Sequence, residues 1–343
     1  MDDIEGIDVN SVTSWFEAHV GGVRPPLAFD LIAGGRSNLT YRVDDAAGSS
    51  WVLRRPPLGQ TLPTAHDMGR EYRIISALGP TPVPVPTAIG FCDDESVNEK
   101  PFYVMGYVDG HILRDSETTA KVLDEPGRRA AAESLVDVLA EIHAVDPDAV
   151  GLGDLGRKEG YIQRQLKRWY SQWEKSKTRE IPAVDEVHER LLEAVPEQGP
   201  ATIVHGDYRL DNTMLGDDAQ VLAVLDWEIC TLGDPLADVG LLCVYWADPG
   251  EELSALLSAP TTLDGFPRRG EIAARYARRS GRDLSRLDYY VAFGYWKLAC
   301  ILEGVYARYV AGAMGGDRQG VDAFADQVVR LAEMAQDRVP AGG

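Results

Sequence analysis

The amino-acid sequence predicts an α+β fold in which a small sheet lobe precedes a larger helical lobe. The segment up to Gly110 consists mainly of short alternating runs typical of strands, whereas the later segments have the apolar spacing of helices. A strand-rich insert at 203–227 interrupts these helices. A sheet lobe followed by a helical lobe is an arrangement that leaves a cleft between the two.

The N-terminal segment is expected to form a helix, three strands, a second helix and two more strands. Trp15 and Phe16 mark the apolar side of the first helix, and the adjacent glycines 34 and 35 end the first strand. The prolines of residues 79–86 exclude helix and central strand, so this stretch is predicted to be an extended connector. The expected helices are 10–20 and 70–78, and the expected strands are 27–32, 39–43, 51–54, 87–91 and 102–108.

The C-terminal segment is expected to be mainly helical. Helices are predicted at 128–143, at 160–177 and beyond Glu251, and the polar tail from about Gly315 is expected to fray at its end. We place the lobe boundary after residue 108, which gives an N-terminal lobe of residues 1–108 and a C-terminal lobe of residues 109–343.

One apolar stretch, residues 289–310, is long enough to resemble a membrane span. Lys297, Glu303 and Arg308 interrupt it, however, so it predicts a buried or amphipathic helix. The N-terminus is acidic and lacks the basic-then-apolar pattern of a signal peptide. We therefore expect a cytoplasmic protein with no membrane partner.

Composition excludes several classes of function. The net charge of −20 argues against nucleic acid or an anionic membrane as the main partner. The cysteines are scattered without the spacing of a zinc site, which predicts small buried thiols in a reducing compartment. They are Cys92, Cys230, Cys243 and Cys300.

Residues 203–228 carry the strongest chemical signal in the chain. Asp207 and Asn212 lie five residues apart after a short apolar run, and Asp226 ends a second apolar run. Phosphoryl transfer needs a carboxylate that holds the acceptor hydroxyl in line, and oxygen ligands for Mg²⁺ on the nucleotide phosphates. Asp207 fits the first role, and Asn212 and Asp226 fit the second. The alternative is that Asp207 and Asn212 only cap turns.

The local charge supports an ion site. Residues 201–250 contain nine acidic residues and a single basic one, Arg209. So many carboxylates repel one another unless a cation or basic partners compensate them. Asp217 and Asp218 are expected to lie in a solvated hairpin turn, but Asp226 at the end of an apolar run is not explained in that way.

These motifs resemble those of the aminoglycoside phosphotransferase family, H-G-D-x-x-x-x-N followed by an apolar run that ends in Asp. The resemblance implies a protein-kinase-like bilobal fold, ATP as phosphoryl donor with GTP not excluded, and Mg²⁺. It also implies that Asp207 is the catalytic base and that Asn212 and Asp226 are metal ligands. His205 is expected to hold the loop, and Asp238 to brace it.

The nucleotide-binding residues are expected in the N-terminal lobe. The loop that contains Gly34, Gly35, Ser37 and Asn38 lies where a phosphate-covering loop belongs, because glycines let backbone amides approach phosphate oxygens. A plain hairpin turn is the alternative. At the hinge, we expect Met105, Tyr107 and Val108 to line the adenine site, although a methionine there is as often core.

The third strand departs from the family pattern. The usual phosphate-binding lysine would fall at Arg54, and a guanidinium can still bind phosphate. Glu71 on the following helix is its expected carboxylate partner, with an ordinary exposed glutamate as the alternative. Arg55 competes for the role, but strand alternation places it on the opposite face.

Two basic runs in the helical lobe bear on the acceptor. Residues 157–179 carry eight basic residues with interleaved aromatics, and residues 268–286 carry seven. The sequence of residues 161–169 and 52–57 resembles that of the kinase-like domains fused to some acyl-CoA dehydrogenases, and of their free-standing bacterial relatives. That resemblance implies a small-molecule hydroxyl acceptor that is anionic, of the hydroxyacyl-CoA type. Solvated helix faces are the alternative.

Two other functions compete with this reading. One is true aminoglycoside resistance, which a cation-binding acidic pocket would favour. The other is a nucleotide-binding pseudokinase module, which only Arg54 favours. The sequence leaves the oligomeric state open.

Overall fold

The computed structural model describes residues 4–33, 38–58, 67–251, 259–312 and 321–339. The chain forms two compact units, and the predicted α+β fold is confirmed. The first unit contains Met1–Gly110 and Leu222–Glu228, and the second contains His111–Val221 and Ile229–Gly343. The functional division after residue 108 stays a prediction.

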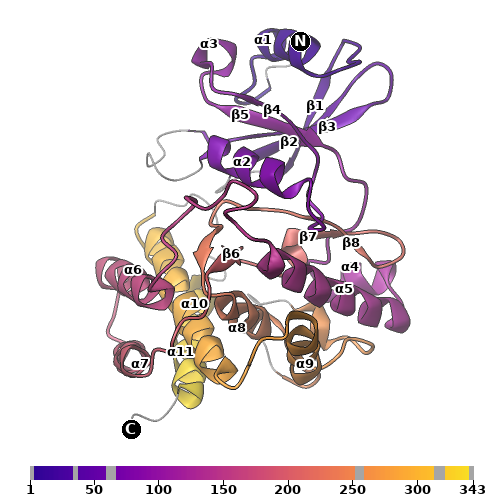
Figure 1. Cartoon of the computed structure of the whole chain (residues 1–343). Coiled ribbons are helices and arrows are strands. Elements are labelled where there is room, and N and C mark those ends of the chain that lie inside the picture. Colours follow the sequence, from indigo (N-terminus) through magenta and orange to yellow (C-terminus); the bar gives the residue numbers. More distant parts are fainter. Residues whose placement is uncertain (1–3, 34–37, 59–66, 252–258, 313–320, 340–343) are drawn as a thin grey trace. The chain divides into compact units, whose positions relative to one another are not determined.

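The first unit is built on a five-stranded antiparallel sheet (Figure 1). The spatial order is β1-β2-β3-β5-β4, and all neighbours are antiparallel. The strands are β1 (Ala28–Ala33), β2 (Leu39–Asp44), β3 (Ser50–Arg55), β4 (Ala88–Cys92) and β5 (Phe102–Gly106), and the helices are α1 (Val9–His19), α2 (Met68–Leu78) and α3 (Glu95–Asn98).

The two longer helices pack on opposite faces of this sheet. Phe16 of α1 contacts Trp51 of β3, and Trp15 contacts Phe102 of β5. Successive side chains of a strand point to opposite faces of the sheet. The strand residues next to Trp51 and Phe102 therefore point towards α2. Tyr103 accordingly meets α2, where its ring lies 6.3 Å from that of Tyr72. This alternation directs Arg54 towards α2 and Arg55 towards the α1 side.

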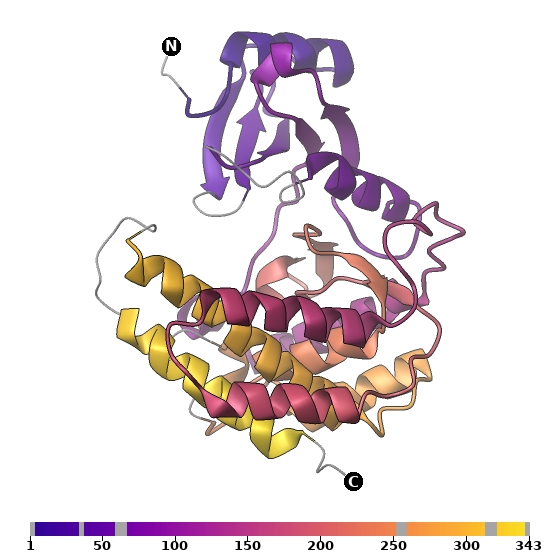
Figure 2. The same cartoon turned by 90° about the vertical axis from the view of Figure 1, so that its left-hand side faces the viewer.

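The second unit is a set of helices around the buried helix α10 (Figure 2). Helix α10 is apolar on nearly every side because α6, α7, α8 and α11 all pack against it. The helices are α4 (Ser116–Val122), α5 (Glu125–Ala144), α6 (Tyr161–Ser176), α7 (Pro182–Glu193), α8 (Leu236–Tyr245), α9 (Arg269–Ser280), α10 (Leu287–Val310) and α11 (Val321–Arg338). Among the described helices, none is both long and apolar enough to cross a membrane.

Short strands and turns carry the residues of the predicted motif. β6 (Thr202–Val204) pairs with β9 (Thr231–Gly233), and the 3₁₀ turn η1 (Leu210–Asn212) follows. β7 (Thr213–Leu215) then leads to a turn in which Gly216 bonds to Gln220, and β8 (Val221–Val224) comes next. A second 3₁₀ turn, η2 (Pro260–Thr262), precedes α9.

Candidate active site

The loop that carries Asp207 begins where β6 ends. Gly206 turns the chain with φ of +88°, a conformation that residues with a side chain rarely adopt. A Cβ added at Gly206 would lie 3.1 Å from the side chain of Ile229. The backbone conformation favours glycine at this position, and the nearby Ile229 side chain leaves little room for a larger residue.

Three side chains of the second unit surround the Asp207 carboxylate. The Tyr245 hydroxyl donates to Oδ1 at 3.0 Å, and the Asn212 amide donates to Oδ2 at 3.0 Å. The Arg209 guanidinium lies 3.6 Å from Oδ2. The side chain of Asp207 is nevertheless 28% exposed, so it is held in place and still reachable by a ligand.

The backbone before Asp207 is held by buried side chains. Asp238 of α8 accepts the N–H groups of His205 and Gly206 at 2.7 and 2.8 Å. His205 is fully buried, and its Nδ1 accepts from the Asp207 N–H at 3.3 Å. The expectations that His205 holds the loop and that Asp238 braces it are therefore confirmed in geometry.

His143 of α5 supports this brace. Its Nε2 lies 3.3 Å from Asp238 Oδ2, and its Nδ1 lies 2.7 Å from the Tyr276 hydroxyl. Burial lowers the pKa of His143, so the ring is neutral near pH 7 and Nε2–H donates to Asp238. Burial opposes ionisation of Asp238, but the hydrogen bond from His143 and the backbone N–H groups lower the pKa of that carboxyl overall.

Lys297 of α10 contacts the same loop at Gly206. It is 7% exposed, and its Nζ donates to the Gly206 carbonyl at 3.0 Å. The ammonium also lies 5.6 Å from the centre of the Trp169 ring. Burial lowers the pKa of Lys297, while Asp207 and Asp238 act in the opposite direction. A buried cation is costly, so its retention beside the loop indicates a specific role.

A cavity of about 150 Å³ opens beside Asp207 in the second unit. Its apolar wall includes Leu242 and Trp246, and two arginines, Arg114 and Arg209, also line it. Arg209 stacks on Tyr245 at 4.8 Å and lies 3.4 Å from Asp211, the acidic side chain of the lining. This lining does not resemble the acidic pocket that a polycationic aminoglycoside would favour.

In the first unit, Arg54 joins two carboxylates. Its Nε lies 3.3 Å from Glu71, and its Nη2 donates to Asp226 at 2.5 Å. The expected pairing of Arg54 with Glu71 is confirmed, and the guanidinium uses different nitrogens for the two partners. Burial acts to lower the pKa of Arg54, but the attraction of these acidic neighbours raises it overall.

Glu71 lies at the centre of a buried polar cluster. It accepts from Asn38 Nδ2 at 2.8 Å and from the Tyr103 hydroxyl at 3.1 Å. Only 2% of its side chain is exposed, so the alternative of an ordinary exposed glutamate is wrong. Burial raises the pKa of Glu71 to about 7, although Arg54 opposes that shift.

The structure also places the other predicted nucleotide-site residues. Arg55 is directed away from this cluster and donates to the carbonyl of Gly6. Met105 is 7% exposed in β5, opposite Val52, and Tyr107 lies beneath the Arg42 guanidinium at 4.7 Å. Val108 follows β5 and is partly exposed. Residues Gly34, Gly35 and Ser37 lie outside the described residues.

Much of the acidic cluster at 201–250 is compensated by the protein itself. Asp234 accepts from the Tyr290 hydroxyl at 2.6 Å, and Asp248 accepts from the Arg269 N–H at 2.7 Å. Asp238, Asp226 and Asp211 have the partners described above. The count of nine acids against one base therefore overstated the need for a metal ion, because most partners come from distant parts of the chain.

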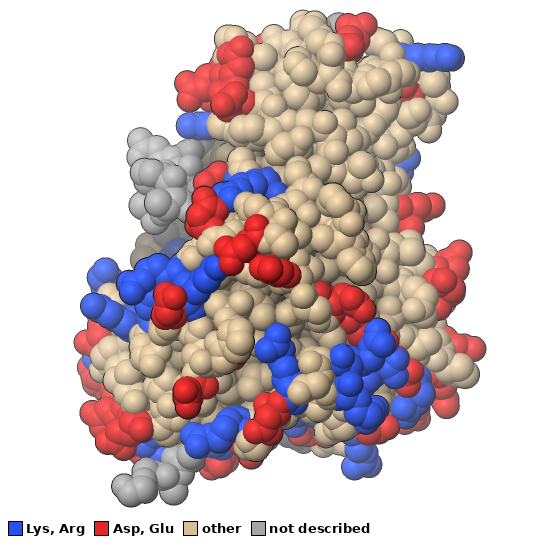
Figure 3. All heavy atoms as spheres, viewed as in Figure 1, with Lys and Arg blue, Asp and Glu red and all other residues tan. Residues whose placement is uncertain are grey.

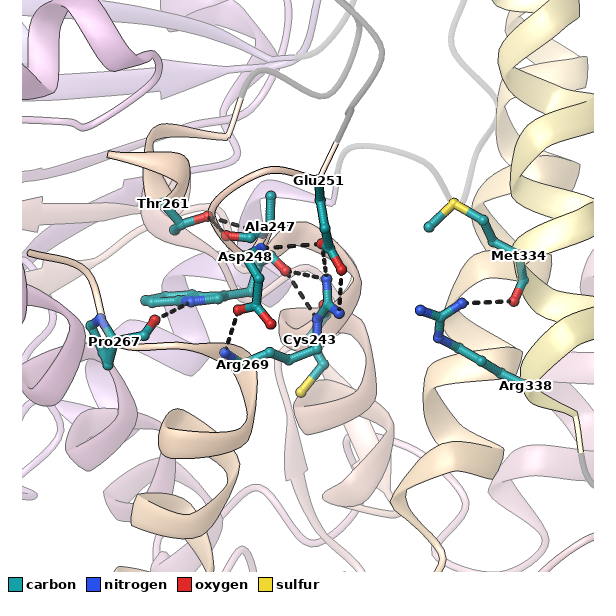
Figure 4. Close-up of polar contacts among 10 residues, drawn as sticks. Cys243, Ala247, Asp248, Glu251, Thr261, Pro267, Arg269, Met334 and Arg338 are labelled. Carbon is teal, nitrogen blue, oxygen red and sulfur yellow. Dashed lines mark hydrogen bonds and ion pairs between the residues drawn. The ribbon is translucent and has the colours of Figure 1, made fainter. Parts of the chain in front are cut away.

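The two basic runs differ in their surroundings. Arg269 is enclosed by Glu251, Asp248 and the carbonyls of Cys243 and Trp246 (Figure 4). Arg275 and Arg279 of α9 form ion pairs with acidic residues of α5, namely Glu133, Asp137 and Glu141. These arginines of the run 268–286 hold elements of the second unit together, so this run no longer supports a substrate site.

Sequence reasoning missed Tyr245, His143 and Lys297 as neighbours of the loop. Tyr245 and His143 lie at the ends of helices, where nothing in the local pattern distinguishes them. Lys297 did leave a signal, because a lysine in the middle of an otherwise apolar helix is unusual. That signal served only to exclude a membrane span.

Comparisons with known proteins agree with this geometry. A family model described as the phosphotransferase enzyme family (APH) matches residues 29–290. Acyl-CoA dehydrogenase family member 10 of Mus musculus is 38% identical over 320 residues, which is 92% of this chain. The match spans 29% of that protein, so this chain corresponds to less than a third of its length.

Solved structures show the same fold. A presumed aminoglycoside phosphotransferase of Ralstonia eutropha is 34% identical, with a TM-score of 0.82 and coverage of 97% of this chain and 98% of that one. The GDP complex of aminoglycoside 2'-phosphotransferase-IIIa has a TM-score of 0.62 at 13% identity, with coverage of 95% and 99%. At that identity the likeness concerns the fold alone.

Proposed function

The chain belongs to the phosphotransferase enzyme family, and from this premise we propose that it transfers the γ-phosphoryl group of ATP to a hydroxyl group of a small molecule. The observation that carries the proposal is the setting of Asp207. Its carboxylate is oriented by Tyr245 and Asn212, and it remains partly exposed beside a cavity.

Asp207 acts as the base in this proposal. It accepts a hydrogen bond from the acceptor hydroxyl, holds that oxygen in line with the γ-phosphorus and takes its proton as the bond to phosphorus forms. Two donors, Tyr245 and Asn212, orient the carboxylate and leave lone pairs on its oxygens for the acceptor hydroxyl. Most of the rate enhancement then comes from positioning and charge stabilisation.

Mg²⁺ fits the side chains that the motif supplies. Asn212 uses its Nδ2 towards Asp207, which leaves its amide oxygen for a ligand. Asp226 offers a carboxylate in a left-handed backbone conformation with φ of +61°. Mg²⁺ is usually bound through one or two carboxylates together with substrate phosphates, so this donor set is suitable. When bound, the ion neutralises phosphate charge.

We assign nucleotide binding to the first unit. The loop with Gly34, Gly35, Ser37 and Asn38 is proposed to cover the phosphates, and Arg54 to contact them while Glu71 orients it. The residues proposed for the adenine site are Met105, Tyr107 and Val108. GTP is the alternative phosphoryl donor.

The acceptor is proposed to be anionic and of the hydroxyacyl-CoA type, in a cytoplasmic enzyme. The arginines that line the cavity beside Asp207 favour an anion over a polycation. The 38% identical relative is named as an acyl-CoA dehydrogenase family member. Because that name refers to acyl-CoA, it supports an acyl-CoA acceptor for this chain.

An acceptor panel tests the proposal. ADP release is measured with Mg²⁺ and ATP against hydroxyacyl-CoAs, simple sugars, choline-like alcohols and aminoglycosides, and the product is identified by mass. We expect turnover with hydroxyacyl-CoA and none with aminoglycosides. Turnover confined to aminoglycosides would overturn the acceptor class, and ATP binding without turnover on any acceptor would favour a pseudokinase.

A further inference from the structure

The outward face of α6 carries a basic groove. Leu166 and Trp173 of this helix are fully buried towards α10, whereas Lys167, Arg168 and Ser171 on the opposite side of the helix are exposed. The groove has a volume of about 610 Å³. Among the described residues, its lining contains four cationic and three uncharged polar side chains and no acidic one, namely Arg164, Lys167, Arg168, Ser171, Gln172, Lys175 and Ser176. Figure 3 shows basic side chains gathered over this helix.

Most of the cations of the groove lack an ion-pair partner among the described residues. Lys167, Arg168 and Lys175 form no ion pair within the ranges that the structure describes, in contrast to Arg275 and Arg279 of α9. Like charges on adjacent helical turns repel one another. A protein of net charge −20 has many carboxylates that could have neutralised them. Their absence from the groove indicates a ligand that supplies the negative charge.

Arg164 adds a second, independent observation. Its Nη1 is buried without a hydrogen-bond partner among the described residues, while its Nη2 donates to the Arg157 carbonyl at 2.6 Å. Burial lowers the pKa of Arg164, with Arg157 adding to the effect. A buried donor without an acceptor is costly, so a rotation of this side chain that brings Nη1 to an anionic oxygen in the groove would be favourable.

The groove is connected to the catalytic loop through two side chains. The Arg168 guanidinium lies 5.1 Å from the centre of the Trp169 ring, and the Lys297 ammonium lies 5.6 Å from the centre of the same ring. Lys297 in turn donates to the Gly206 carbonyl, next to Asp207. A ligand held in the groove is thus close to the residues that position the base.

We propose that the α6 groove binds the phosphate-bearing handle of the acceptor, an inference that rests on the proposed function and makes its acceptor class specific. Arg164 and Lys175 are eleven residues apart, which corresponds to about 16 Å along a helix. That length is more than enough for the cations to contact both the 3'-phosphate and the diphosphate of CoA, which are carried by a single ribose. The hydroxyl of Ser171 and the amide of Gln172 supply further donors to phosphate oxygens.

Calorimetric titration tests the groove directly. CoA, pantetheine and inorganic tripolyphosphate are the probes, and the nucleotide site is first saturated with Mg²⁺ and AMP-PNP. We expect CoA to bind at least about tenfold more tightly than pantetheine. This ratio of affinities should decrease as the salt concentration rises, because salt screens exposed charges. Tripolyphosphate should bind more weakly than CoA, since it lacks the pantetheine arm.

A charge-reversed pair supplies the variant. Lys167→Glu with Lys175→Glu should lower CoA affinity at least about tenfold and leave pantetheine affinity unchanged, because only the phosphates lose partners. Arg278→Glu on α9 is the matched control, since Arg278 is equally exposed, and it should change CoA affinity less than about twofold. Thermal unfolding checks that all variants fold.

Several results would overturn the assignment. These are equal binding of CoA and pantetheine, unchanged CoA binding by the double variant, an equal loss in Arg278→Glu, or tripolyphosphate binding as tightly as CoA. Binding of Mg²⁺ with ATP and acceptor-dependent ADP release are measured separately in the wild-type protein. Failure of those two concerns the proposed function, whereas failure of CoA binding alone concerns the groove.

Discussion

At the scale of single residues, Arg54 differs most from the pattern of the family. Its guanidinium contacts Glu71 through Nε and Asp226 through Nη2, whereas a lysine would have to reach both carboxylates with a single nitrogen. We predict that nucleotide affinity falls in the order wild type, Arg54→Lys, Arg54→Ala, because lysine keeps the charge and one of the two contacts. Fluorescence titration with Mg²⁺ and AMP-PNP measures the order. If Lys proves as damaging as Ala, the two-nitrogen geometry is essential.

The proposed metal ligands are expected to contribute unequally. Asp226→Ala removes an anionic oxygen, so the Mg²⁺ concentration needed for half-maximal nucleotide binding should rise at least about tenfold. Asn212→Ala removes a neutral oxygen, so it should raise this Mg²⁺ concentration less than Asp226→Ala does. The comparison is made by nucleotide titration at several Mg²⁺ concentrations. An unchanged Mg²⁺ requirement in the Asp226 variant would contradict the site.

Glu71 makes stability depend on pH in a predictable direction. Its pKa is raised from 4.5 to about 7 by burial, so the folded state favours the protonated carboxyl. This contribution is fully present below pH 4.5 and is lost as pH rises through about 7. In the nucleotide-free protein, the free energy of unfolding of the wild type should therefore fall relative to Glu71→Gln between pH 5 and pH 8. Urea unfolding of both proteins at four pH values measures this change. If the difference in unfolding free energy between wild type and Glu71→Gln did not vary with pH, the raised pKa of Glu71 would be refuted.

The contacts around Asp207 show why the sequence predicted only part of the site. Asp207 and Asn212 are close in sequence, and a motif of fixed spacing identifies both. Tyr245 and Lys297 come from α8 and α10, and only tertiary packing brings them to the loop. No local pattern encodes such contacts, so a lysine in an apolar helix was the only available signal.

At the scale of elements, α10 joins the packing of the helical unit to the catalytic loop. Lys297→Met keeps the length of the side chain but removes the bond to the Gly206 carbonyl and a costly buried charge. We predict that stability is unchanged or increased while kcat falls about tenfold or more, with nucleotide affinity unchanged.

Thermal unfolding and steady-state kinetics of Lys297→Met provide the measurement. Lys121→Met is the matched control, because Lys121 is exposed on α4 and, among the described residues, forms an ion pair with Glu117 alone. The Lys121 variant should keep the unfolding temperature and the kcat of the wild type. A Lys297 variant that loses stability and activity together would indicate an ordinary packing role.

The elements were predicted well where apolar spacing was regular. The strands of the sheet and helices α1, α2 and α6 begin and end within two residues of their expected bounds. Helix α11 was not singled out among the helices expected beyond Glu251, because the tail from about Gly315 was judged by its polar composition. Its buried residues Val328, Leu331, Ala332 and Ala335 have helical spacing and pack on α10.

At the scale of the whole molecule, the distribution of charge separates two kinds of basic surface. Arg275 and Arg279 of α9 are paired with acids of α5 and belong to the framework, whereas Lys167, Arg168 and Lys175 of α6 form no ion pair within the described residues. Sequence counting treated the two runs alike, because it records how many bases are present and not which acids fold against them. An overall charge of −20 therefore does not exclude an anionic ligand at one surface.

The central claim is that Asp207 is the base of an ATP-dependent phosphoryl transfer. Single-turnover transfer of the γ-phosphoryl group to the acceptor found in the panel, compared between wild type and Asp207→Asn, tests it most directly. The two side chains have nearly the same shape, and the amide oxygen can still accept from Tyr245, but it is a poor base. We predict a loss of about 10²-fold or more in transfer rate, with nucleotide affinity and unfolding temperature unchanged. Transfer by Asp207→Asn near the wild-type rate would contradict the account.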